Sequence, residues 1–131
     1  MQEHPNAAAL RRLFDALEAR DVGSVQELVA EDAGWTFPGR RGLIAGEHRG
    51  REAILRFLAS VMTLTGGTFS LELHDIAGSD DHAVALFTGR GQRNGKTLEN
   101  PTVLVVTMRD GRAGDFREFV WDLEHVEDFW S

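Results

Sequence analysis

Residues 35–58, WTFPGRRGLIAGEHRGREAILRFL, decide the fold of this chain. The stretch begins as a short aromatic strand, continues through a loop punctuated by glycines, and ends in an amphipathic helix after Gly50. Apolar residues of that helix recur every three or four positions, which places them on one face: Ile54, Phe57, Leu58, Val61 and Met62. Gly66 and Gly67 then end the helix. The pattern predicts a helix that packs one face against another layer.

Two shorter helices are expected ahead of this stretch. The first covers residues 7–20, with Asn6 as its N-cap after Pro5. Asp21 can cap the second helix, whose buried side is expected to hold Val22, Val25, Leu28 and Val29.

The apolar period changes from helical to two after residue 68, which is typical of strands. Strands are expected over residues 68–74, 82–93, 98–108 and 113–122. Asn94-Gly95 and Asp110-Gly111 lie at the turns between the later strands, and Asn-Gly is a strong signal for a two-residue hairpin. Consecutive hairpins beside three helices predict an α+β fold.

Composition limits the class of protein. The 131 residues suit a single domain, with 42% hydrophobic and 27% charged residues. The chain has no cysteine, which excludes disulfides, zinc thiolate sites and cysteine nucleophiles. A net charge of -7 argues against nucleic-acid binding. We see no signal peptide and no membrane span, and we expect a cytoplasmic protein.

The Asn94-Gly95 turn fixes which residues of the two adjoining strands lie opposite each other. It pairs Arg90 with Glu99, where an ion pair is expected, and Gly89 with Asn100. The face that carries Gly89 and Asn100 holds several small residues. These residues either leave room for a ligand or ease the curvature of the sheet.

The second turn allows two registers. A two-residue loop at Asp110-Gly111 places Glu118 beside Val103, on the face of Arg90. A three-residue loop over residues 109–111 places Glu118 beside Thr102, on the inner face. We favour the three-residue loop because it also buries the apolar residues that flank Glu118. A slip of one residue moves the whole strand to the other face, so this turn decides whether Glu118 lines a pocket.

The order of helices and strands, together with the closing sequence REFVWD (residues 117–122), resembles the SnoaL-like branch of the nuclear transport factor 2-like superfamily. The resemblance covers nearly the whole chain. It implies a cone-shaped, curved antiparallel sheet wrapped around three N-terminal helices, as in cystatin-like rolls. It also implies a pocket for an apolar small molecule, no cofactor, and a homodimer.

Two enzyme patterns of that superfamily match only in part. Ketosteroid isomerases need a tyrosine and two acids, but this chain has no tyrosine and carries Phe14, Phe37 and Val106 at the corresponding positions. In limonene epoxide hydrolases the last-strand acid is similar to Glu118, but the companion Arg-x-Asp is missing from residues 85–91. The SnoaL-like ending itself matches Asn100, Glu118 and Asp122.

Glu118 is the main catalytic candidate. An inward carboxyl between apolar neighbours would have a raised pKa, which suits a general acid or base, whereas an outward one would pair with an arginine. Asn100 is expected to orient a ligand or hold Glu118, and Asp122 is a second acid that could instead cap the strand end. The expected ligand-binding residues are Trp35, Phe37, His48, Phe57, Phe87, Thr102, Phe116 and Val120.

Two functions remain open. One is acid–base chemistry on an apolar molecule (isomerisation, cyclisation, dehydration or hydrolysis). The other is a noncatalytic binding or dimerisation module. The histidines lack metal-ligand spacing, so we expect no metal.

Overall fold

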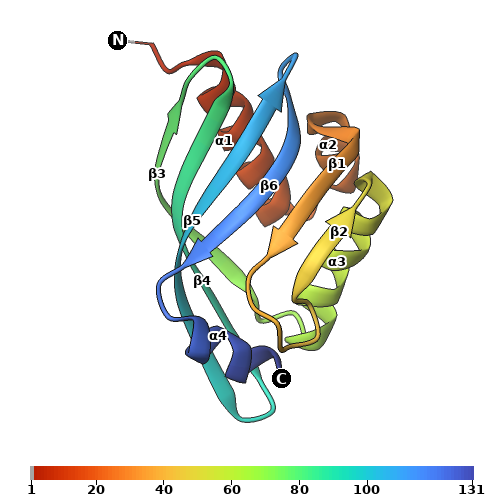
Figure 1. The fold of residues 1–131 in the computed structure, drawn as a ribbon, viewed down its shortest axis with the longest axis vertical. Coiled ribbons are helices and arrows are strands. Elements are labelled where there is room, and N and C mark those ends of the chain that lie inside the picture. The colour runs from red at the N-terminus through yellow and green to blue at the C-terminus, as the bar shows by residue number, and fades with distance from the viewer. Residues whose placement is uncertain (1) are drawn as a thin grey trace.

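The computed structural model describes residues 2–131, over which the chain forms four helices and six strands (Figure 1). The helices are α1 (Pro5–Ala19), α2 (Val22–Leu28), α3 (Arg51–Leu64) and α4 (Leu123–Trp130). The strands are β1 (Val29–Phe37), β2 (Gly46–Arg49), β3 (Ser70–Gly78), β4 (His82–Arg93), β5 (Lys96–Arg109) and β6 (Arg112–Val120). None of the helices in this range is long and apolar enough to cross a membrane.

The predicted α+β fold with a curved sheet around the helices is confirmed. All six strands join one sheet in the order β2-β1-β6-β5-β4-β3. Neighbouring strands are antiparallel except β1 and β6, which pair in parallel and so bring Trp35 beside Phe116. β2 forms within the stretch expected to be a loop, because residues 46–49 find pairing partners on β1.

The start of α1 differs from the prediction. His4, rather than Asn6, is the N-cap, and its Nδ1 accepts a hydrogen bond from the backbone N–H of Asn6 at 3.0 Å. Pro5 occupies the first turn, where its missing N–H costs nothing. Asn6 is buried and donates to the carbonyls of Ser79 and Asp80 at 2.8 and 3.0 Å. It therefore ties α1 to the β3–β4 turn.

The register of β4 and β5 is confirmed, including the Gly89–Asn100 and Arg90–Glu99 pairs. The expected ion pair between Arg90 and Glu99 is wrong. Arg90 instead donates to Glu72 on the other neighbouring strand, at 2.6 Å. The prediction considered only the pairing of β4 with β5, whereas β3 also carries an acid close to Arg90.

The β5–β6 turn also differs from the prediction. Arg109 pairs with Arg112 across a two-residue Asp110-Gly111 turn, so the expected three-residue loop is wrong. The ladder then shifts by one residue after the Met108–Ala113 pair, and Glu118 lies opposite Leu104 rather than Thr102. This β-bulge restores the inward direction of Glu118 that a regular ladder from the same turn would have reversed.

The C-terminal segment forms the short helix α4. Val126, Phe129 and Trp130 of this helix are buried. Side chains of the β4–β5 hairpin hold its end: Lys96 Nζ donates to the Asp128 carbonyl at 2.6 Å, and Arg93 donates to the Phe129 carbonyl at 3.2 Å. Figure 1 shows α4 beside this hairpin, at the end of the sheet.

The contact between α1 and β3 can be tested at Gly78. A Cβ at this position would lie 2.7 Å from the backbone nitrogen of Ala7, which cannot move as a flexible side chain can. We expect Gly78→Ala to lower the free energy of unfolding by about 1–3 kcal/mol in urea denaturation. Gly23→Ala is the matched control, since its Cβ would meet only a side-chain oxygen at 3.6 Å. Equal stability of the two variants would contradict this close packing.

Candidate active site

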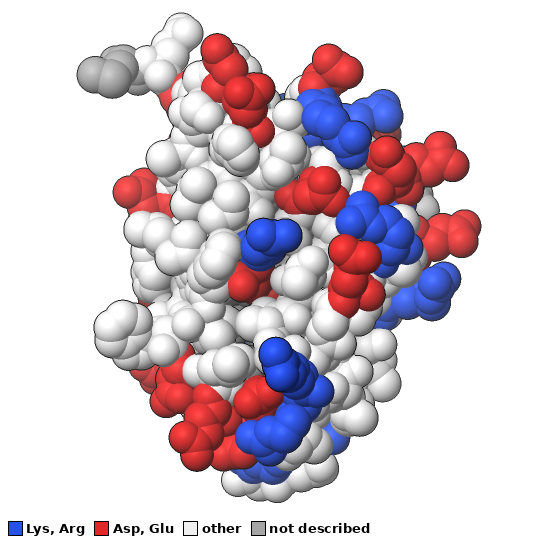
Figure 2. Space-filling view, in the orientation of Figure 1, with Lys and Arg blue, Asp and Glu red and all other residues white. Residues whose placement is uncertain are grey.

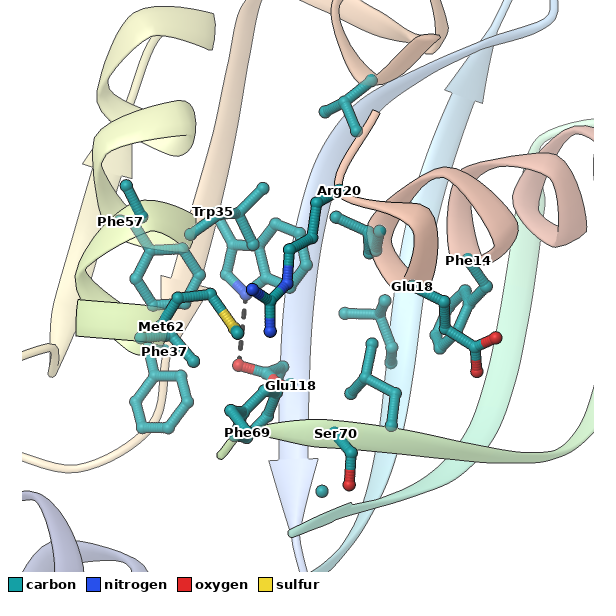
Figure 3. Close-up of a pocket in the computed structure, with 18 of the residues that line it drawn as sticks. Phe14, Glu18, Arg20, Trp35, Phe37, Phe57, Met62, Phe69, Ser70 and Glu118 are labelled. Atoms are coloured by element: carbon teal, nitrogen blue, oxygen red, sulfur yellow. Dashed lines mark hydrogen bonds between the residues drawn. The ribbon is translucent and has the colours of Figure 1, made fainter. Parts of the chain in front are cut away.

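A cavity of about 640 Å³ lies between α1, α3, the start of β3 and the inner face of the sheet. Its wall is mostly aromatic and aliphatic, and the aromatic members are Phe14, Trp35, Phe37, Phe57, Phe69, Phe87 and Trp130. The exposed lining residues Glu18, Arg20, Arg56 and Ser70 mark its mouth. Arg20, which follows α1, is labelled in Figure 3; its guanidinium donates to the Gly67 carbonyl at 3.3 Å, after the end of α3.

Glu118 lies in the wall of this cavity. β6 holds it opposite Leu104, and only 9% of its surface is exposed. The indole Nε1–H of Trp35 donates a hydrogen bond to Oε2 of Glu118 at 3.1 Å, the dashed line of Figure 3. Within residues 2–131, no lysine, arginine or histidine forms an ion pair with this carboxyl. Trp35 therefore holds one carboxyl oxygen and leaves the other without a protein donor.

Burial raises the pKa of Glu118 to about 7, because the charged form is removed from water, while the hydrogen bond from Trp35 opposes this rise. Near neutral pH the protonated and ionised forms of Glu118 are thus both well populated. A carboxyl in this state can give or accept a proton without a large penalty, which is the property required of a general acid or base.

Two expected ligand-binding residues form a layer behind the cavity wall. Phe116 stacks on Trp35 with ring centroids 4.3 Å apart. His48 stacks on Phe57 at 4.4 Å, and its Nε2 is 2.9 Å from the carbonyl oxygen of Ile44. Neither residue lines the cavity, so both support the rings that do.

The structure places the remaining expected residues as follows. Trp35, Phe37, Phe57, Phe87 and Asn100 line the cavity together with Glu118. Thr102 is buried in the sheet, where its hydroxyl donates to the Asn100 carbonyl at 3.1 Å, and half-buried Val120 packs against the core. Asp122 is not brought to the cavity. It is exposed and caps α4, accepting the backbone N–H of His125 at 3.1 Å.

The sequence analysis missed several lining residues. Phe14 and Leu17 belong to the apolar face of α1, and this helical period was a signal that could have found them. Phe69 and Trp130 gave no such signal, because each lies at the boundary of an element. Among residues 2–131, no group of three or more histidines or acids is arranged to hold a metal ion.

Comparison with known proteins identifies the family. The profile of the SnoaL-like domain matches residues 10–115, and the chain belongs to this family of the nuclear transport factor 2-like superfamily. The structure of Bal32a, from a soil-derived mobile gene cassette, is 36% identical with a TM-score of 0.93, and the match covers 97% of each chain. The structure of TerC co-crystallized with polyporic acid is 26% identical with a TM-score of 0.81, over 96% of this chain and 98% of TerC. An uncharacterized protein of Mycobacterium tuberculosis is 28% identical over the full length of both chains.

The raised pKa of Glu118 predicts a specific dependence of stability on pH. Because the folded-state pKa of about 7 exceeds the ordinary value of 4.5, the folded state binds this proton more tightly than the unfolded state. The contribution of this group to the free energy of unfolding is therefore fully present below about pH 4.5. It is lost as pH rises to 7, by up to about 3 kcal/mol. In urea unfolding, Glu118→Gln should remove this loss and be more stable than the wild type at pH 8.

Glu99→Gln is the matched control, because Glu99 is an exposed acid on β5. This control should keep the pH dependence of the wild type. Parallel pH profiles for the wild type and Glu118→Gln would contradict a raised pKa at this carboxyl.

Proposed function

We propose that the protein binds an apolar small molecule in this cavity and that Glu118 acts on it as a general acid and base, without a cofactor. The observation that carries the proposal is a carboxyl in an apolar wall, with a pKa of about 7 and a single hydrogen-bond donor. The reaction class is proton transfer to or from carbon, as in isomerisation, cyclisation or dehydration. Water activation for hydrolysis would use the same group.

The site suggests how each residue would act. The ionised carboxylate takes a proton from the carbon next to a substrate carbonyl and becomes the neutral acid, leaving an enolate. The acid then returns the proton to a different carbon or to the enolate oxygen. Trp35 holds Oε2 throughout, so Oε1 is the oxygen that faces the reacting atom. The surrounding rings exclude water, which keeps the pKa of Glu118 near neutrality.

Two comparisons support this proposal without deciding the substrate. Membership of the SnoaL-like family is consistent with a small-molecule pocket. TerC, whose fold is similar, was crystallized with polyporic acid. Six of the residues expected to form the site line the cavity of this chain, as a binding role requires.

The alternative is a noncatalytic binding module on the same fold. The observation that favours it is that, within residues 2–131, no second acid or base forms a hydrogen bond or an ion pair with Glu118, and Asp122 caps α4 instead. An enolate formed here would have no acidic partner from the known isomerase pattern, because Phe14 and Val106 stand where that pattern has its tyrosine and its late-strand acid.

Proton exchange on 2-tetralone, a flat apolar ketone, separates the two functions. In D2O, the α-proton signals of the ketone should decay faster with the protein than with buffer, and the rate should rise through about pH 7 as Glu118 ionises. Glu118→Gln should reduce the protein-dependent rate at least ~100-fold, whereas Glu99→Gln should leave it unchanged. Binding of the ketone without any exchange above buffer would support the noncatalytic module and overturn catalysis by Glu118.

We further propose a homodimer formed through the outer face of the sheet. Leu86, Val103 and Phe119 lie in one row across β4, β5 and β6, and Trp121 follows with 87% of its surface exposed. Figure 2 shows an uncharged region over the left part of this face, with one basic and one acidic group near the middle and most other charged groups on the right and at the lower end. Exposed apolar rows of this kind favour association, and a two-fold axis would bury the row against its own copy.

Sedimentation velocity tests this surface. The wild type should sediment as a dimer, and Phe119→Glu and Trp121→Glu should sediment as monomers, because each places a charge in the buried row. Leu43→Glu is the control, since Leu43 is also exposed, at 61%, but lies in the loop before β2. A monomeric wild type, or dimers that survive both substitutions, would exclude this interface.

A further inference from the structure

The backbone of Arg20 adopts a conformation that is unfavourable for most residues with a side chain. Arg20 is the C-cap of α1, with φ 55° and ψ 38°, in the left-handed region. Glycine is the usual residue at such a helix end, because a Cβ is strained there. Within residues 2–131 the other non-glycine residues with positive φ are Asn94 and Asp110, both of types that tolerate hairpin turns. Arginine has no such conformational advantage, and strain of this kind is commonly retained for function.

The side chain of Arg20 lies at the mouth of the cavity, which it helps to line. Its Nη2 donates to the Gly67 carbonyl at 3.3 Å, so it connects the end of α1 to the loop between α3 and β3. That loop leads into Phe69 and Ser70, which also line the cavity. Within residues 2–131 no other hydrogen bond holds this guanidinium, which has five N–H donors. Most of these donors are therefore available to a ligand.

The positive charge of Arg20 is not neutralised by an acid. The cavity lining contains two cations, Arg20 and Arg56, and neither forms an ion pair within residues 2–131. Glu18 also lines the mouth, but Figure 3 shows its carboxyl and the Arg20 guanidinium directed apart. A chain with a net charge of -7 thus keeps unpaired arginines at the entrance of an apolar cavity.

We propose that Arg20 binds a carboxylate of the ligand at the mouth of the cavity, while the apolar body of the ligand lies inside. The planar guanidinium presents paired N–H donors that match the two oxygens of a carboxylate. A phosphate fits less well, because its second charge would be opposed by Glu18 at the same mouth. The inference rests on the proposed function only in that the ligand occupies the same cavity.

This contact would also fix the orientation of the ligand. Besides Glu18 at the mouth, the acid in the cavity lining is Glu118, which is buried in apolar surroundings. A ligand carboxylate beside Glu118 would bring a second negative charge into a site that is already costly for one. The acidic end therefore stays at Arg20, and the apolar end of the ligand enters first and reaches Glu118.

Two probes that differ in charge test the contact. They are 4-(2-naphthyl)butanoate and its primary amide, which share one apolar frame. Binding is measured by titration calorimetry at about pH 6, where the acid probe is ionised and Glu118, with a pKa of about 7, is mostly protonated. The wild type should bind the acid about five- to tenfold more tightly than the amide. The preference should weaken in high salt, because the mouth is exposed.

Substitutions of Arg20 give the second readout. Arg20→Gln and Arg20→Gly should each reduce the preference for the acid to about one. Arg20→Gly should also unfold at a midpoint no lower than that of the wild type, because glycine adopts the left-handed conformation without strain. Arg12→Gln is the matched control: it removes the same charge from an exposed position of α1 outside the cavity lining, and it should keep the preference.

Several results would overturn the proposal. They are equal binding of the two probes by the wild type, no detectable binding of the acid, and a preference that survives both Arg20 substitutions or is lost equally in Arg12→Gln. A preference that depends on Arg56 instead would also exclude Arg20. A lower unfolding midpoint of Arg20→Gly with unchanged affinity for the acid would show that Arg20 serves only to end α1.

The outcome is independent of the catalytic proposal. The exchange test with 2-tetralone involves no carboxylate on the ligand, so exchange without a preference for the acid would refute only the role of Arg20. A preference for the acid without any exchange would refute only catalysis by Glu118.

Discussion

The pairing of β6 with β5 decides which side chains of β6 face the cavity and which face the outer surface of the sheet. Alternate residues of a strand face opposite sides, so a single extra residue in the ladder exchanges the two sides of everything that follows. The bulge after Ala113 supplies that residue. It turns Phe116 and Glu118 toward the helices and leaves Phe119 on the outer face. One local irregularity thus sets the polar group of the cavity and the apolar row of the opposite surface.

The raised pKa of Glu118 depends in part on residues that do not line the cavity. An ionised carboxyl is costly to bury, and one indole N–H only partly offsets this cost. The cost persists because water is kept away by rings that are themselves supported: Phe116 stacks behind Trp35, and His48 stacks behind Phe57. The aromatic layer behind the wall therefore supports the burial that raises the pKa of Glu118.

Much of the fold could be predicted because its signals are local. The apolar stripe of α3, the Asp21 cap of α2 and the Asn94-Gly95 turn each depend on a few neighbouring residues. β2 could not be predicted in this way, since it exists only by pairing with β1. The bulge could not be predicted either, because it is a shift in the pairing of β6 with β5 and no local sequence signal marks it.

The candidate site was predicted in the same uneven way. Strand alternation and family resemblance pointed to Glu118 and Asn100, and the aromatic residues of β1 and α3 also line the cavity. Trp130 was missed as a lining residue because its contribution requires α4 to fold back across β5, which a helix of eight residues does not reveal by its period. His48 and Phe116 were misplaced by one layer, since sequence cannot show which of two stacked rings is the inner one.

The cavity wall joins elements from opposite ends of the sequence, with Phe14 on α1 and Trp130 on α4. No contiguous fragment of the chain contains a complete wall, so the binding site forms only when the whole domain has folded. A ligand held there is bound by the native state and not by partly folded forms. Occupancy should therefore slow amide exchange that proceeds by global unfolding, even in strands such as β3 that contribute few lining residues. Ligand binding and cooperative folding of the domain would therefore depend on the same contacts, those that bring α1 and α4 to one cavity wall.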